Sequence, residues 1–236
     1  MSKYYRSILI ALPVLLLGML ICSAVVTDRY FLWMSFLFLA VAMLPFYVRF
    51  ERKAFSSREI VLIAVLAAIA AVSRVPFAVL PSIQPTSFVI IISGIVLGGE
   101  SGFLIGATAA LVSNLFLGQG PWTPWQMFSW GMMGLTSGLL GNTWLLRRTA
   151  GRVLFGFLWG FLYGWIMNGW VLLGFLEGLT WPSIVSTYAM SFYFDLAHAC
   201  SNAVFLALFS ANWMKIMTRF QQKYGLLQVQ ERRKIS

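Results

Sequence analysis

The chain has 236 residues, of which 60% are apolar and only 10% are charged, and its mean hydropathy is +0.82. A soluble domain carries about 25% charged residues, so the composition excludes a water-soluble protein and predicts an integral membrane protein. The net charge of +10 is spread over short basic patches between apolar runs, a pattern that indicates membrane topology rather than nucleic-acid binding.

Eight apolar runs predict an all-α, polytopic membrane helix bundle. Most of them approach the roughly 20 residues needed to cross about 30 Å of hydrocarbon. The fourth and fifth are shorter, and the glycine-rich stretch 98–102 between them predicts a tight hairpin that need not span the membrane. The runs lie at 7–26, 30–48, 59–80, 87–99, 101–117, 126–146, 153–176 and 191–214.

The polar, basic stretch from Arg49 to Arg58 marks the main boundary in the chain. Before it, residues 1–50 predict an accessory transmembrane hairpin, because the first apolar run is too long for a usual cleaved signal peptide. Residues 51–57 predict a cytoplasmic linker, residues 58–215 a core of the six remaining helices, and residues 216–236 a basic cytoplasmic tail.

The basic residues also predict the orientation of the bundle. If the amino terminus is cytoplasmic, fifteen of the seventeen Lys and Arg residues fall on inner segments, and only Arg29 and Arg74 fall outside. Because positive charge concentrates on the cytoplasmic side, we expect a multi-pass protein of the plasma membrane with both termini in the cytoplasm.

Several kinds of chemistry are missing from the sequence. None of the five lysines follows a glycine, so no phosphate-binding loop is present. The single histidine, His198, excludes an HExxH zinc protease, and no Gly-x-Ser-x-Gly element exposes a serine nucleophile. Cys22 and Cys200 both fall in apolar runs, so no disulfide framework or zinc site is expected. We therefore expect no catalytic residue, no metal site and no cofactor.

Ionisable residues inside a membrane span are costly and indicate function. Asp195, His198 and Asn202 recur at i, i+3 and i+7 in the last run and so share one helix face. This face predicts one wall of an outward-facing pocket, with Tyr188 and Tyr193 beside it. The alternative is an Asp195–His198 pair that is satisfied between helices, and a metal-binding role for His198 is a third possibility.

A second polar and aromatic cluster precedes and opens the sixth run. Prolines 121 and 124 stiffen a loop that carries two tryptophans, and amide side chains lie on both sides of it. Tryptophans at this depth often only anchor a protein to the membrane interface. The added amides favour a ligand platform, because they form directional hydrogen bonds while indole rings stack on flat solutes. The cluster contains Asn114, Gln119, Trp122, Trp125 and Gln126.

Three more polar side chains are expected on the outer side. Arg74 either extends to the membrane interface or pairs with an anionic group of the ligand, and both interpretations stay open at this stage. Gln84 lies in the extended segment after the third run, and Asn168 lies in the seventh run. Together these residues predict an apolar, aromatic cavity with neutral hydrogen-bonding groups, which suits a vitamin-sized organic solute.

Small residues form a stripe on the third run, at Ala64, Ala67, Ala68 and Ala71. Such stripes allow helices to approach closely. The stripe therefore predicts either packing within the bundle or close docking against another protein.

With these residues in view, the stretch 57–148 resembles the S components of energy-coupling factor (ECF) vitamin transporters. The resemblance rests on the alanine stripe, the outer segment with Pro81, Gln84 and Pro85, the glycine hairpin at 98–102, and Asn114. It implies that a coupling subunit docks on the alanines, that two partner ATPases supply the energy, and that the S component topples in the membrane. The run 118–126 is most similar to cobalamin-specific members, which implies cobalamin as transported substrate.

The resulting expectation is a vitamin-binding, non-enzymatic membrane subunit with no nucleic-acid partner. A self-contained secondary transporter or channel, and an intramembrane enzyme, are the alternatives. The predicted substrate-binding residues are Arg74, Gln84, Asn114, Gln119, Trp122, Trp125, Gln126, Asn168, Tyr188, Tyr193, Asp195, His198 and Asn202, and the predicted partner-docking residues are Ala64, Ala67, Ala68 and Ala71.

Overall fold

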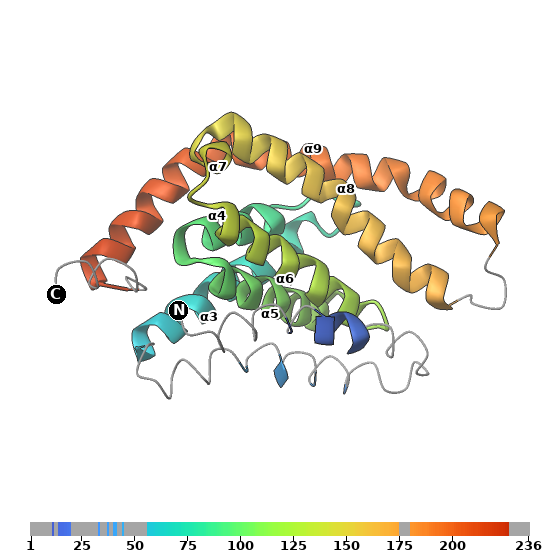
Figure 1. The fold of residues 1–236 in the computed structure, drawn as a ribbon, viewed down its shortest axis with the longest axis horizontal. Coiled ribbons are helices and arrows are strands. Elements are labelled where there is room, and N and C mark those ends of the chain that lie inside the picture. Colours follow the sequence, from blue (N-terminus) through green and yellow to red (C-terminus); the bar gives the residue numbers. More distant parts are fainter. Residues whose placement is uncertain are drawn as a thin grey trace.

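A computed structural model describes residues 56–174 and 180–226, together with residues 11, 14–19, 33, 37, 40, 41 and 44. Every regular element in residues 56–174 and 180–226 is a helix, which confirms the all-α prediction (Figure 1). Most of the predicted hairpin at 1–50, most of the linker at 51–57, and residues 227–236 lie outside the described part of the chain. The elements are α3 (Ser57–Val72), η2 (Val75–Phe77), α4 (Thr86–Leu97), α5 (Gly99–Leu117), α6 (Thr123–Leu140), α7 (Trp144–Arg147), α8 (Thr149–Gly174) and α9 (Trp181–Tyr224).

Within the described residues, four helical segments are long and apolar enough to cross a membrane: Ser57–Phe77, Gly99–Leu117, Thr149–Leu172 and Trp181–Tyr224. The 12 residues of α4 span only about 18 Å at 1.5 Å per residue. This agrees with the prediction of a short fourth helix, whereas the expectation of a short fifth helix is wrong, because α5 has 19 residues and is long enough to cross.

The start and end of α3 follow from local sequence. A capping box begins the helix, in which the Ser56 amide donates to Glu59 Oε2 at 2.6 Å. The helix ends at Val72, earlier than the predicted position 80, because Pro76 has no amide proton to donate to the Val72 carbonyl. The short helix η2 follows, so the chain turns directly after Arg74.

Two other boundaries also differ from prediction. The sixth predicted run, 126–146, is divided into α6 and α7. Thr143 adopts an extended conformation that interrupts the helix, and it is the N-cap of α7. The last helix begins at Trp181, where Thr180 caps it, and continues to Tyr224. At about 66 Å it is longer than a membrane is thick. It bends past the start of α8, and its last part turns toward α3 (Figure 1).

Helix α4 lies among α3, α5, α6 and α9, and most of its residues are buried. Helices α5 and α6 approach each other closely, because a Cβ added at Gly134 would overlap the backbone of Gly102. Helices α8 and α9 form an antiparallel pair along one side of the bundle (Figure 1). Polar side chains from α4, α5, α6, α8 and α9, and from the turn after α3, meet inside the bundle.

Candidate functional site

Arg74 turns into the bundle rather than toward the membrane interface. Its Nη1 donates to Asn114 Oδ1 at 2.7 Å and to Ser113 Oγ at 3.0 Å, both on α5. Its guanidinium carbon lies 5.3 Å from the centre of the Trp130 ring on α6, in a cation–π arrangement. The turn after α3 thus places a cation at the centre of the predicted polar cluster.

Asn114 connects Arg74 to the next helices. Its Nδ2 donates to Gln126 Oε1 at 2.7 Å, and Gln126 Nε2 donates to the Tyr163 hydroxyl on α8 at 2.9 Å. Asn114 and Gln126 are both buried. We call this series of hydrogen bonds, from Arg74 through Asn114 and Gln126 to Tyr163, the Arg74–Tyr163 chain; it crosses three helices of the bundle.

The Tyr163 ring joins this chain to His198. It stacks on Trp130 with ring centres 5.4 Å apart, and the His198 ring meets it edge-on at 4.7 Å. His198 Nε2 lies 2.8 Å from Ser87 Oγ on α4. Tyr163 and Ser87 were not predicted as site residues, because one tyrosine and one serine in long apolar runs carry no distinguishing spacing.

A second series of hydrogen bonds runs from Asn114 to Gln119 in the loop that carries the tryptophans. Asn114 Nδ2 also donates to Thr123 Oγ1 at 3.0 Å, Thr123 donates to Gln119 Oε1 at 2.9 Å, and Gln119 Nε2 donates to the Leu111 carbonyl at 3.0 Å. The Gln119 amide therefore braces its own loop. Trp122 packs beside Trp170 on α8, with ring centres 6.1 Å apart, and Trp125 is buried.

Asp195 and Asn168 form a second polar group with Ser191, which was not predicted. Asn168 Nδ2 donates to Ser191 Oγ at 2.7 Å, and Ser191 Oγ donates to Asp195 Oδ2 at 3.0 Å. Asp195 is one helical turn before His198, so this group lies beside the Arg74–Tyr163 chain. The alternative of a pair between Asp195 and His198 does not occur, because each is hydrogen-bonded to a serine.

Asn202 and the backbone of Gln84 take part in other contacts. Asn202 Nδ2 donates to the Gly156 carbonyl at 3.0 Å, and the backbone N–H of Gln84 donates to Ser201 Oγ at 3.0 Å. Their contacts connect α9 to α8 and to the segment before α4.

Tyr188 and Tyr193 are not brought to this cluster. The Tyr188 hydroxyl donates to the Trp165 carbonyl at 3.4 Å, and Tyr193 is 78% exposed. Tyr193 is two positions from Asp195, and residues at i and i+2 point to different sides of a helix.

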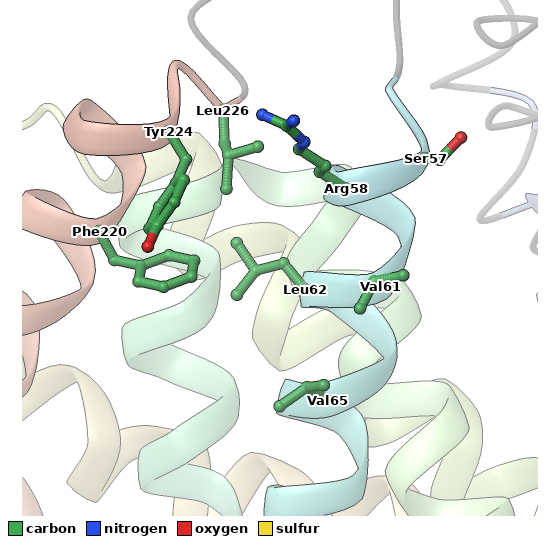
Figure 2. Close-up of a pocket in the computed structure, with 8 residues that line it drawn as sticks. All are labelled: Ser57, Arg58, Val61, Leu62, Val65, Phe220, Tyr224 and Leu226. Atoms are coloured by element: carbon green, nitrogen blue, oxygen red, sulfur yellow. The ribbon is translucent and has the colours of Figure 1, made fainter.

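The predicted alanine stripe is divided between two faces of α3. Ala67 and Ala71 are buried within the bundle, whereas Ala64 and Ala68 are exposed. Beside the exposed face, the start of α3 and the end of α9 border a groove of about 500 Å³. Phe220 and Tyr224 of α9 lie across this groove from Leu62 of α3 (Figure 2).

No three His, Cys, Asp or Glu side chains gather into a metal site within the described residues. The polar cluster instead gathers amides, hydroxyls and one guanidinium beside aromatic rings. These are groups that hydrogen-bond to and stack on organic solutes.

Comparison with known proteins identifies the family. Residues 54–219 match a family model described as ECF-type riboflavin transporter, S component. The chain is also 31% identical over 90 residues to a UPF0397 protein of Vibrio atlanticus (strain LGP32), an alignment that covers 36% of this chain and about half, 49%, of that relative. No solved structure matches. Since the family model covers more than half of the sequence, the chain belongs to the S-component family of ECF-type riboflavin transporters.

Proposed function

We propose that this chain is the vitamin-binding subunit of an ECF-type importer in the plasma membrane, with both termini in the cytoplasm. The coupling subunit and two cytoplasmic ATPases would be separate proteins, which accords with the lack of a phosphate-binding loop in this chain. The subunit would capture its ligand outside and deliver it by toppling in the membrane.

The observation that carries this proposal is the Arg74–Tyr163 chain. Its two amides are buried, and its hydrogen bonds run in one direction to a tyrosine whose ring stacks on Trp130. Polar groups of fixed direction beside stacked rings, in a chain that belongs to a transporter S-component family, suit a flat vitamin with hydrogen-bonding edges.

Riboflavin is the first ligand to test, because the family description names it and its ring system is flat and edged with carbonyl groups. Cobalamin is the second, from the similarity of residues 118–126 to cobalamin-specific members. The loop argument for cobalamin is weakened by geometry, since Gln119 is bonded to Leu111 and Trp125 is buried.

Titration of the detergent-purified protein tests the function. Riboflavin binding is followed by quenching of tryptophan fluorescence, and cyanocobalamin binding by co-elution of its visible absorption. We expect Asn114→Ala and Gln126→Ala to weaken binding about fivefold to a hundredfold, because each leaves buried partners unpaired. Asn142→Ala, in the exposed turn after α6, is the matched control. Failure of the wild type to bind either vitamin would contradict the proposal.

A further inference from the structure

The direction of every hydrogen bond in the Arg74–Tyr163 chain is set by Arg74. A guanidinium can only donate, so the oxygen of Asn114 must face Arg74 and its NH₂ must face Gln126. The Gln126 oxygen is then the acceptor, and its NH₂ must face Tyr163. Neither amide can be turned around without placing two donors or two acceptors against each other.

This direction has a consequence at Tyr163. Its hydroxyl oxygen accepts from Gln126, so its proton is directed elsewhere, and the described residues form no hydrogen bond with that proton. The branch through Thr123 and Gln119 differs, because its last hydrogen bond is donated to the Leu111 carbonyl.

Other donors beside Tyr163 are also unused. The indole nitrogens of Trp130 and Trp125 are buried and find no acceptor in the described part of the chain. Arg74 forms hydrogen bonds through Nη1 alone, and no carboxylate pairs with it within the described residues. A cation inside a membrane bundle without a counter-ion is costly, so an acceptor-rich group beside it would be strongly stabilised.

Resting on the proposed function, we infer that this site selects ligands by their acceptor atoms: it recognises a group that offers carbonyl or phosphate oxygens to the Tyr163 hydroxyl, the Trp130 indole and Arg74. Arg74 acts as a positioning residue for the donors as well as a charge. A ligand edge that offers only N–H groups is rejected, because it would place donor against donor in a buried site.

The Gln126→Glu variant tests the inference with an almost isosteric change. A carboxylate still accepts from Asn114, but it also accepts from Tyr163 and so turns the hydroxyl proton away from the ligand. We expect the affinity for riboflavin to fall tenfold to a hundredfold, while the melting temperature in detergent is not lowered. Tyr163→Phe keeps the ring stacking and removes the same donor, so it should give a similar loss.

Three further comparisons make the test specific. The double variant Gln126→Glu/Tyr163→Phe should bind riboflavin no more weakly than whichever single variant has the lower affinity. Both changes remove the same donor, the Tyr163 hydroxyl proton, so their effects should not add. Gln222→Glu, near the exposed end of α9, is the control and should bind as the wild type does. Riboflavin 5′-phosphate distinguishes a phosphate from a ring carbonyl as the acceptor. If it binds more tightly than riboflavin and its affinity falls as salt is added, a phosphate lies beside Arg74. If the two flavins bind equally, ring carbonyls are the acceptors.

The outcomes separate the two proposals. A wild type that binds riboflavin, with Gln126→Glu and Tyr163→Phe variants that bind it within twofold of the wild type, would overturn donor-directed selection and leave the transport function standing. A wild type that binds neither flavin nor cyanocobalamin would overturn both.

Discussion

The carboxylate of Asp195 on α9 packs directly against Gly164 on α8. A Cβ added at Gly164 would overlap the Asp195 carboxyl group, and the three atoms nearest to that Cβ all belong to this group. Two further glycines, Gly156 and Gly160, precede Gly164 at four-residue spacing and meet Leu206 and Ala199 of α9 in the same way. This small-residue face lets α8 and α9 approach closely enough to enclose polar side chains between them.

The contact predicts the effect of one added methyl group. Gly164→Ala should lower the free energy of unfolding by about 1–3 kcal/mol through overpacking, measured as a lower melting temperature in detergent. Adding Asp195→Ala to the same chain should restore part of the loss, because it removes the overlapping carboxylate. Leu158→Ala, on the exposed face of α8, is the control. An unchanged melting temperature for Gly164→Ala would show that the two helices are not packed this closely.

Arg152 predicts a different kind of loss. It is buried and donates to the carbonyls of Leu146 and Arg147 and to the hydroxyls of Thr149 and Ser210, which ties α7 and α8 to α9. Arg152→Met should destabilise the fold by at least about 1.5–3 kcal/mol, the usual contribution of a hydrogen bond to a charged group.

Arg152→Lys should rescue only part of this loss, because an ammonium group lacks the planar set of donors. Arg148→Met is the matched control: its side chain is exposed, lies over the Trp144 ring, and should contribute no more than about 1 kcal/mol. Equal melting temperatures for Arg152→Met and Arg148→Met would contradict the structural role of Arg152.

Substitutions on the two faces of the alanine stripe should have different effects, one on docking and the other on folding. Ala64→Trp and Ala68→Trp add bulk on an exposed face, so they should reduce co-purification with the coupling subunit and leave vitamin binding by the isolated chain unchanged. Ala67→Trp and Ala71→Trp add bulk in the core and should lower the yield of folded protein itself. Normal complex formation and transport by both exposed-face variants would place the docking surface elsewhere.

The predicted orientation is tested by labelling in intact cells. A cysteine that replaces Pro121 or Trp181 should react with a membrane-impermeant thiol reagent from outside, because both positions lie at helix starts on the side away from most basic residues. A cysteine that replaces Arg147 should stay unlabelled until the membrane is opened. The reverse labelling pattern would show that the bundle has the opposite orientation in the membrane.

The helical architecture and the tight α4–α5 hairpin could be predicted from the sequence, because apolar runs report membrane burial and Gly98, at φ 95°, allows the turn. The ends of α9 could not. Its first and last turns carry polar and exposed residues that fall below the hydropathy of the central run, yet Thr180 caps the first turn and the backbone stays helical to Tyr224.

The polar cluster could be predicted in its composition but not in its connections. Asn114 and Gln126 are indicated by the polar, aromatic run that contains them, and the structure joins them by a hydrogen bond. Tyr163 was missed, since its partner Gln126 is 37 residues away in the sequence and its own helix is rich in aromatic residues. Long-range hydrogen bonds depend on how helices pack, and helical periodicity alone does not reveal that packing.

Reconstitution in liposomes separates a binding subunit that needs its partners from a self-contained transporter. The purified chain is inserted into vesicles, alone or with the coupling subunit and both ATPases, and uptake of labelled riboflavin or cobalamin is measured with and without ATP. We expect the chain alone to bind its vitamin and accumulate none, and concentrative uptake to require all partners and ATP. Concentrative uptake by the chain alone, driven by an ion gradient, would instead identify a self-contained secondary transporter.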